Sequence, residues 1–358
     1  MATAAPAFSE LTPGDVHAWM ADRGQPRYRA DQLLRWFYRS AAESFAEMSD
    51  LPEALRDNLA AAFRFSTVTP AHTTGADSGR TVKYLFQLPD KELLESVSMH
   101  YPRTASSSER TTVCLSTQVG CAVRCPFCAT GLAGLARNME LAEVIDQVLA
   151  VSRRESQAGR RVSHLVYMGM GEPLHNVEAT MTSLRRFTDP AALGLGVRRV
   201  TVSTSGVVPG IEKLSASGLG VNLAVSLHSP IDDLRDTLVP LNKKWNIGAV
   251  LKAADDYAAR TGRRVSYEYV MLGGVNDSIS LADALGTLLR RRLAHVNLIP
   301  YNPIPGDPFR ATPPAQIEAF RARVKDHGVE CTVRDTRGRR IDAACGQLRA
   351  EAQAGSLA

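Results

Sequence analysis

Three cysteines lie close together in the sequence, at a spacing that suits a metal centre. They form a Cys-x3-Cys-x2-Cys run and are Cys121, Cys125 and Cys128. Thiolates bind metals, and three of them on one short loop can reach a common centre. A structural zinc site takes four protein ligands, and residues 100–140 offer only His100 and Cys114 as a fourth. The run is therefore one ligand short of a closed zinc site.

An iron–sulfur cluster suits the three thiolates better. A four-iron cluster is usually held by four cysteines, so with three ligands one iron stays open for another molecule. A Cys-x3-Cys-x2-Cys loop after the first strand of a barrel is the signature of the radical S-adenosylmethionine (SAM) superfamily, and this sequence resembles it. The resemblance implies one 4Fe-4S cluster and SAM as cofactors.

From about residue 110 onward, strand-like and helix-like patterns alternate. The predicted strands are 111–116, 164–168, 199–204, 221–227, 265–272 and 295–300. Helical periodicity follows Asn138 and Asn246, and a late helix follows Pro314. Six strands with helices between them favour an α/β fold with a partial parallel (β/α)6 barrel.

Candidate binding residues follow four of these strands. In such barrels the binding groups lie at the carboxyl ends of the strands. Each of these turns alone is typical of a strand-to-helix connection, but four of them in register with the cysteine loop favour one shared site. The candidates are Gly171, Glu172, Ser203, Ser226, Leu227, His228 and Asn302.

The chain before the barrel divides into two parts. Residues 1–75 read as a helical N-terminal domain, and residues 76–106 as a β-hairpin linker. We expect the barrel over 107–340 and a C-terminal segment over 341–358.

Glu95 interrupts the apolar face of the second hairpin strand, which otherwise carries Leu93, Val97 and Met99. Burial among apolar neighbours would raise the pKa of its carboxyl and make it a better base near neutral pH. A register slip, or a place at the edge of the sheet, would leave it without a role. The pattern alone favours the interpretation without a role.

Charge and composition limit the classes of function. The net charge is +5, which permits an RNA partner without requiring one. Basic residues gather at 153–154, 160–161, 243–244, 290–292 and 334–340. No signal peptide and no membrane-length apolar run is found, so we expect a cytoplasmic protein without a membrane partner. Six cysteines there favour metal or catalytic use over a disulfide framework.

From residue 25 to 348 the sequence resembles the RlmN family of RNA adenine C2 methyltransferases, the sister of the Cfr C8 methyltransferases. The matching stretches are 112–128, 169–176, 203–209, 223–228 and 334–348. The resemblance implies that Cys121, Cys125 and Cys128 hold the cluster and that the seven strand-end candidates bind SAM. It also implies that Cys345 carries the methyl group, with Cys114 as its disulfide partner and Glu95 as proton acceptor.

The family's reaction explains why these groups are needed. The Cys345 thiolate takes a methyl from one SAM, and a radical made from a second SAM activates that methyl for bonding to adenine C2. Glu95 removes the ring proton, and Cys114 releases the product by forming a transient disulfide. The implied partners are 23S rRNA near the peptidyl-transferase centre and tRNA at the adenine 3′ of the anticodon. We also expect an electron donor such as flavodoxin or ferredoxin, a disulfide reductant, and a monomeric enzyme.

Three alternatives stay open. The sister C8 chemistry shares most of these motifs. A zinc-binding RNA module would give Cys345 no role. A glycyl-radical activase would need a protein partner and would leave Cys114 and Cys345 unexplained.

The basic segment Gln25–Arg29, with an aromatic residue inside it, suggests that the helical N-terminal part contacts RNA.

Overall fold

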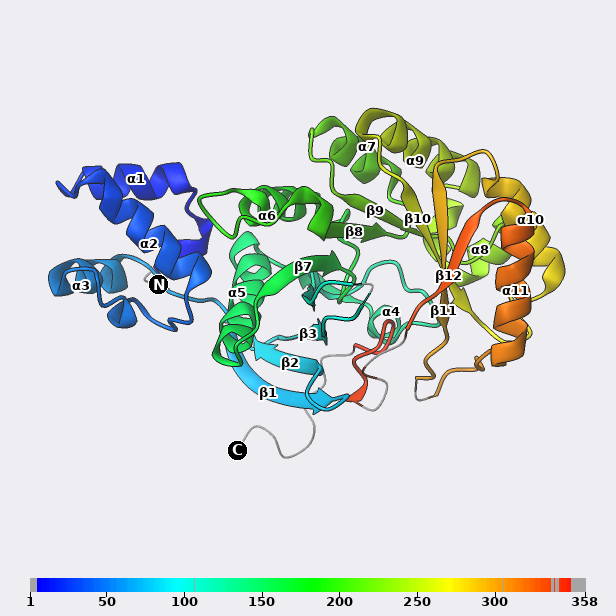
Figure 1. The fold of residues 1–358 in the computed structure, drawn as a ribbon, viewed down its shortest axis with the longest axis horizontal. Helices are drawn as coiled ribbons and strands as arrows, with labels where there is room; N and C mark the ends of the chain where they lie inside the picture. Colours follow the sequence, from blue (N-terminus) through cyan, green and yellow to red (C-terminus); the bar gives the residue numbers. More distant parts are fainter. Residues whose placement is uncertain (1–4, 106, 305, 336–337, 339–340, 349–358) are drawn as a thin grey trace.

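The computed structural model describes residues 5–105, 107–304, 306–335, 338 and 341–348. Parts of the basic run 334–340 and of the expected segment 341–358 lie outside these residues. The described residues form a group of helices beside a large curved sheet, with further helices packed around the sheet (Figure 1).

Over the described residues the sheet has ten strands, and its first part is antiparallel. It begins with β1 (Thr69–Ala76), β2 (Thr81–Gln87) and β3 (Leu93–Tyr101). The predicted hairpin corresponds to β2 and β3, while β1 pairs along β2 and was not expected. β1 is polar and largely exposed, so it lacks the apolar alternation by which a strand is recognised. The expected domain boundary at residue 75 falls inside β1.

The second part of the sheet is parallel. It contains β4 (Arg110–Cys114), β7 (Val162–Tyr167), β8 (Val200–Thr204), β9 (Asn222–Ser226), β10 (Val265–Met271), β11 (Ala294–Pro300) and β12 (Glu330–Val333). The first six confirm the predicted barrel strands, each to within two residues at its ends. β12 extends the row beyond them. In the described residues β1 and β12 are the sheet's two edges, so the barrel is open, as expected.

In the part of the chain that the structure describes, seven helices pack around the parallel strands. They are α5 (Leu141–Gln157), α6 (Val177–Thr188), α7 (Val208–Ala216), α8 (Asp232–Leu238), α9 (Ile247–Thr261), α10 (Ile279–Leu289) and α11 (Pro314–Asp326). α9 begins where predicted, because the Asn246 side chain accepts a hydrogen bond from the Ala249 amide. It ends at Gly262, which has a left-handed backbone. In the described part of the chain, no helix is long and apolar enough to cross a membrane.

The N-terminal helices are α1 (Pro13–Ala21), α2 (Arg27–Arg39) and α3 (Glu53–Ala62). They surround an aromatic cluster in which Phe8 contacts Phe37, Phe45 and Phe63. Buried polar contacts join this group of helices to the barrel. Arg186 of α6 donates to the Tyr38 hydroxyl of α2 at 2.8 Å.

Candidate active site

The cysteine loop is closed at its base by a second, two-stranded sheet. β5 (Gln118–Gly120) and β6 (Leu135–Asn138) pair on either side of it, and the short helix α4 (Ala129–Ala133) lies inside it. At Gly120, φ is +77° and a Cβ would lie 1.8 Å from the Gly134 carbonyl oxygen. Only glycine fits there, because the two ends of the loop approach so closely. Sequence analysis did not predict this pair, since both strands are short.

The three loop cysteines line one cavity at the carboxyl ends of the barrel strands. Burial raises the pKa of Cys121 to about 12, and burial and the neighbouring thiols raise the pKa of Cys125. Such thiols lose their protons when a positive charge binds between them. Among the described residues, no three metal-binding side chains are arranged around a single ion position.

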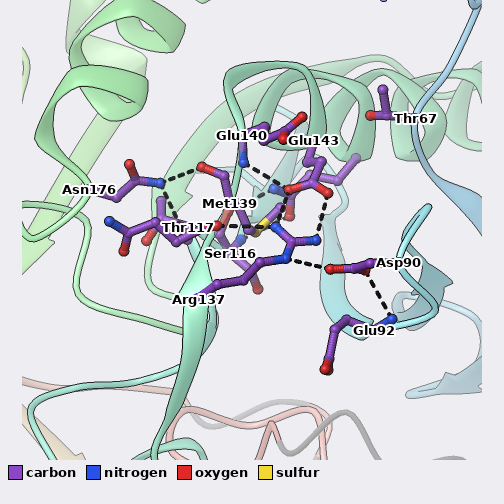
Figure 2. A network of polar contacts seen from close by, with 12 residues as sticks. Thr67, Asp90, Glu92, Ser116, Thr117, Arg137, Met139, Glu140, Glu143 and Asn176 are labelled. Carbon is purple, nitrogen blue, oxygen red and sulfur yellow. Dashed lines mark hydrogen bonds and ion pairs between the residues drawn. The ribbon is translucent and has the colours of Figure 1, made fainter. Parts of the chain in front are cut away.

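A charged network fastens the base of this loop to the rest of the fold (Figure 2). Arg137 of β6 donates to both carboxylate oxygens of Glu143, at 2.8 and 2.9 Å, and to Asp90 at 2.6 Å. Glu143 also accepts from the Glu140 amide at the start of α5. Paired hydrogen bonds between guanidinium and carboxylate are strong and directional. The network therefore holds together β6, α5 and the β2–β3 turn.

A second set of contacts joins the loop to the Gly-Glu-Pro turn. The Gln118 side chain accepts from the Glu172 amide at 2.8 Å and donates to Asn138 at 2.7 Å. Glu172 is buried, and its carboxylate accepts from the amide and the hydroxyl of Ser205 after β8. At Gly171, a Cβ would lie 2.5 Å from the Gln118 side chain. These contacts hold Gly171, Glu172 and Ser205 in place, and all three line the cavity.

Most of the expected SAM residues meet in this cavity. Those that line it are Gly171, Glu172, Ser203, Ser226, His228 and Asn302. Leu227 does not line it. Its side chain is buried in the core, and its amide donates to the Glu268 carbonyl oxygen at 3.0 Å. Leu227 can therefore contribute backbone geometry, but its side chain does not reach the cavity.

His228 has a defined protonation state. Burial lowers its pKa to about 3, so the ring is neutral at physiological pH. Its Nδ1 accepts a hydrogen bond from the Val270 amide at 3.1 Å. The ring proton therefore sits on Nε2, which makes that atom a hydrogen-bond donor.

Arg235 of α8 is a residue that sequence analysis missed. Its guanidinium is fully buried and donates to the carbonyl oxygens of Leu227, Ser205 and Ser226, at 3.0, 2.7 and 3.0 Å. It also donates to the Asn242 side chain at 2.7 Å. Burial lowers the Arg235 pKa to about 10, so the group stays charged at neutral pH. In the sequence alone, a single arginine on a short helix indicates a solvent-exposed side chain, so its burial could not be predicted.

Cys114 and Cys345, from opposite ends of the barrel sequence, line one small cavity of about 30 Å³. Cys114 is at the end of β4, where burial and the charge of Cys345 raise its pKa to about 12. Cys345 also lines the cavity of the loop cysteines. Arg334 lines both cavities, and its guanidinium lies 3.8 Å from the Glu268 carboxylate. Cys345 is therefore placed between the cofactor cavity and Cys114.

Glu95 is buried, as its apolar neighbours suggested. Its carboxylate lies 2.9 Å from the Lys83 ammonium group on β2, a partner that sequence analysis did not predict. Glu95 shares a face of β3 with Val97, which pairs with Cys114 on β4. Glu95 does not line either cavity described above.

Two family models match the chain. The radical SAM superfamily matches residues 115–283, which include the cysteine loop and the strands from β7 to β10. The ribosomal RNA large subunit methyltransferase N-terminal domain matches residues 8–64, which include α1, α2 and α3.

Similar proteins cover nearly the whole chain. A probable dual-specificity RNA methyltransferase RlmN from Thermobifida fusca is 48% identical over 350 residues, or 96% of this chain and 94% of its own. One with the same name from Frankia alni is 50% identical over 92% of this chain and 79% of its own. The crystal structure of a radical SAM methyltransferase from Sphaerobacter thermophilus superposes with a TM-score of 0.92. It is 47% identical and covers 97% of this chain and 100% of its own.

Proposed function

This chain belongs to the RlmN family of radical SAM RNA methyltransferases, and from this premise we propose that it methylates carbon C2 of an adenine. The family uses a 4Fe-4S cluster and SAM. The relatives are named as dual-specificity enzymes. We infer two substrates, an adenine near the peptidyl-transferase centre of 23S rRNA and the adenine 3′ of the anticodon in tRNA. The observation that carries the proposal is the place of Cys345, which lines both the cofactor cavity and the cavity of Cys114.

Cys121, Cys125 and Cys128 would hold the cluster, and the polar residues on the cavity rim would hold SAM. The cluster and SAM, when bound, supply a methyl group and a radical that abstracts hydrogen. The Cys345 sulfur accepts the methyl group and presents its carbon to the adenine ring. Arg334 lines the same two cavities as Cys345 and places a positive charge close to its sulfur.

The remaining steps need a base and a second thiol. Glu95 would accept the ring proton, and its carboxylate lies 2.9 Å from the Lys83 ammonium group. Cys114 would attack the Cys345 sulfur and release the methylated base as the disulfide forms. An electron donor such as flavodoxin or ferredoxin and a disulfide reductant would complete the cycle. Because its substrates would be rRNA and tRNA, we infer that the enzyme acts in the cytoplasm. We also infer that it is a monomer.

The direct test is nucleoside mass spectrometry on RNA treated anaerobically with reconstituted enzyme, SAM and a reductant. We expect 2-methyladenosine. A product of 8-methyladenosine would assign the sister chemistry instead. An RNA without methylated adenine, from enzyme that holds its cluster, would overturn the proposed substrate.

The cysteine and carboxylate roles have their own tests. Cys114→Ala should stall with RNA covalently attached to Cys345, which a gel shift that survives denaturation detects. Glu95→Gln should still methylate Cys345 but lose the ring proton slowly. Free turnover by Cys114→Ala, or wild-type rates for Glu95→Gln, would remove these residues from the mechanism.

A further inference from the structure

A third cavity, of about 600 Å³, lies inside the barrel at the end opposite the cysteine loop. Residues at the amino ends of four parallel strands line its mouth: Arg110 at the start of β4, Arg199 before β8, Asn222 at the start of β9 and Arg264 before β10. Nothing in the mechanism above uses this end of the barrel.

The cavity is strongly basic. Five arginines line it, namely Arg110, Arg199, Arg263, Arg264 and Arg334, against two acidic residues, Glu268 and Asp335. Among the described residues, the first four of these arginines form no ion pair, in contrast to Arg137, Arg160 and Arg292 elsewhere. The positive potential is also felt by His164 on the cavity wall. Its pKa is lowered by burial and then by Arg110 and Arg199. Unneutralised arginines around a hollow form a site for an anion.

The walls also offer groups that recognise a base. Thr201, Asn222 and Ser266 contribute side-chain hydroxyl and amide groups. Tyr101 contributes an aromatic ring, with the Arg110 guanidinium 4.3 Å from its centroid. Arginine and aromatic planes are the surfaces on which unpaired bases stack. A cavity that combines these groups fits a nucleotide better than a simple anion.

This cavity meets the reaction centre. It shares Met168, Glu268 and Arg334 with the cofactor cavity, and Met99 and Tyr101 with the cavity of Cys114 and Cys345. The cavity that the two cysteines line is much smaller, about 30 Å³ against about 600 Å³. The cofactor residues occupy the carboxyl end. The basic cavity is therefore the larger space that leads to Cys345 from the end of the barrel that the cofactor residues do not line.

We propose that the RNA docks across the amino ends of the barrel strands, with its phosphates on Arg110, Arg199 and Arg264 and the flipped target base inside the basic cavity. This rests on the proposed function and assigns the face that receives the RNA. The base then reaches the Cys345 methyl from the side opposite to SAM. Extruding a base from its stack is the usual way for an enzyme to reach a ring atom.

The test compares two double charge reversals in the full-length, cluster-loaded enzyme. Arg199→Glu with Arg264→Glu alters the proposed face. Lys243→Glu with Lys244→Glu makes the same change of charge at the cofactor end, where both lysines are exposed and line a separate hollow. The probe is an RNA stem-loop with an adenine in its loop, and its Kd is measured over a range of salt concentrations. Iron content, SAM binding and Cys345 methylation check that the cofactor end is intact.

We expect the arginine pair to weaken RNA binding at least ~10-fold at low salt and to reduce the salt slope by about 1 per lost phosphate contact. The lysine pair should bind RNA like wild type. Arg199→Lys with Arg264→Lys should keep most of the affinity, because the charge remains.

Two failures are distinguishable. If the wild-type enzyme yields no methylated adenine, the proposed function fails. If wild-type enzyme methylates RNA but the arginine pair binds RNA with wild-type affinity and salt slope, this docking face is wrong. Equal losses in the arginine and lysine pairs would also overturn it, since the effect would then come from net charge alone.

Discussion

The cysteine loop and the Cys345 segment face each other in the site, but they are held in different ways. The loop is bracketed by the β5–β6 pair, and Arg137 fixes its base through two carboxylates. Residues 341–348, the described part of the C-terminal segment, contain no strand and no helix longer than one turn. Thr130 donates to the Leu348 carbonyl at 2.5 Å, and the Gly346 carbonyl accepts from Ala129 at 2.8 Å.

This difference matches the work proposed for each region. A cluster must stay at one place, so charged contacts that leave little freedom suit its loop. A methyl carrier must present its sulfur to SAM, to the base and to Cys114 in turn. A segment held mainly by single backbone hydrogen bonds opens locally at lower free energy than one built into a sheet. The comparison predicts that disruption of the loop affects cofactor content, while disruption of the segment affects only catalysis.

The largest expected effect separates the two groups of cysteines. Cys125→Ala should lose most of its iron and all measurable methylation, because it removes one of three cluster ligands. Cys345→Ala should lose methylation equally but keep the iron and the visible absorbance of wild type. Iron analysis and anaerobic absorbance spectra of both variants make the comparison. Loss of iron from Cys345→Ala would show that the carrier segment also holds the cofactor end together.

Arg235→Met should be the most destabilising single change at the cofactor end. It leaves the carbonyl oxygens of Ser205, Ser226 and Leu227 buried without their donor, at a cost of about 1–3 kcal/mol each before relaxation. We expect a loss of about 3–5 kcal/mol in urea denaturation, together with weaker SAM binding. Arg235→Lys should recover part of both. Wild-type stability and SAM affinity in Arg235→Met would mean that the hydrogen bonds from Arg235 are not needed to hold the strand ends.

Arg137→Gln and Asp90→Asn test the network at the loop's base. Removing Arg137 leaves Glu143 buried and unpaired, so we expect a loss of about 3 kcal/mol and faster loss of iron. Asp90 is 43% exposed in its side chain, so Asp90→Asn should cost at most about 1 kcal/mol.

The pH dependence of the ion pair between Arg137 and Asp90 follows from the Asp90 carboxyl group. The hydrogen bond from Arg137 lowers the Asp90 pKa below 3.8 in the fold. The contribution of the pair is therefore present above pH 3.8 and disappears as the pH falls through the lower, folded value. The unfolding free energies of wild type and Asp90→Asn should therefore differ above pH 3.8, and the difference should vanish as the pH falls through the folded pKa of Asp90. A difference that persists unchanged at lower pH would contradict the assignment.

The elements that could be predicted from the sequence are those with a regular apolar periodicity or a helix cap. Six barrel strands and the helix after Asn246 were recognisable, because apolar periodicity and a cap mark each of them. β1 and the β5–β6 pair were not, since they are polar or short and depend on partners distant in the chain. The buried position of Arg235 and the pairing of Glu95 with Lys83 were hidden for the same reason. Such contacts are set by the tertiary arrangement rather than by local pattern.

The smallest effect would come from the carrier segment itself. Thr130→Val keeps the shape of a buried side chain and removes its hydrogen bond to the Leu348 carbonyl, together with its side-chain hydrogen bond to Cys128. We expect about 1 kcal/mol of local destabilisation, seen as roughly fivefold faster hydrogen exchange in residues 341–348. Exchange in the cysteine loop and the iron content should stay as in wild type. If the loop's amides exchanged faster as well, the two regions would open as one unit, and the contrast in how they are held would have no consequence for catalysis.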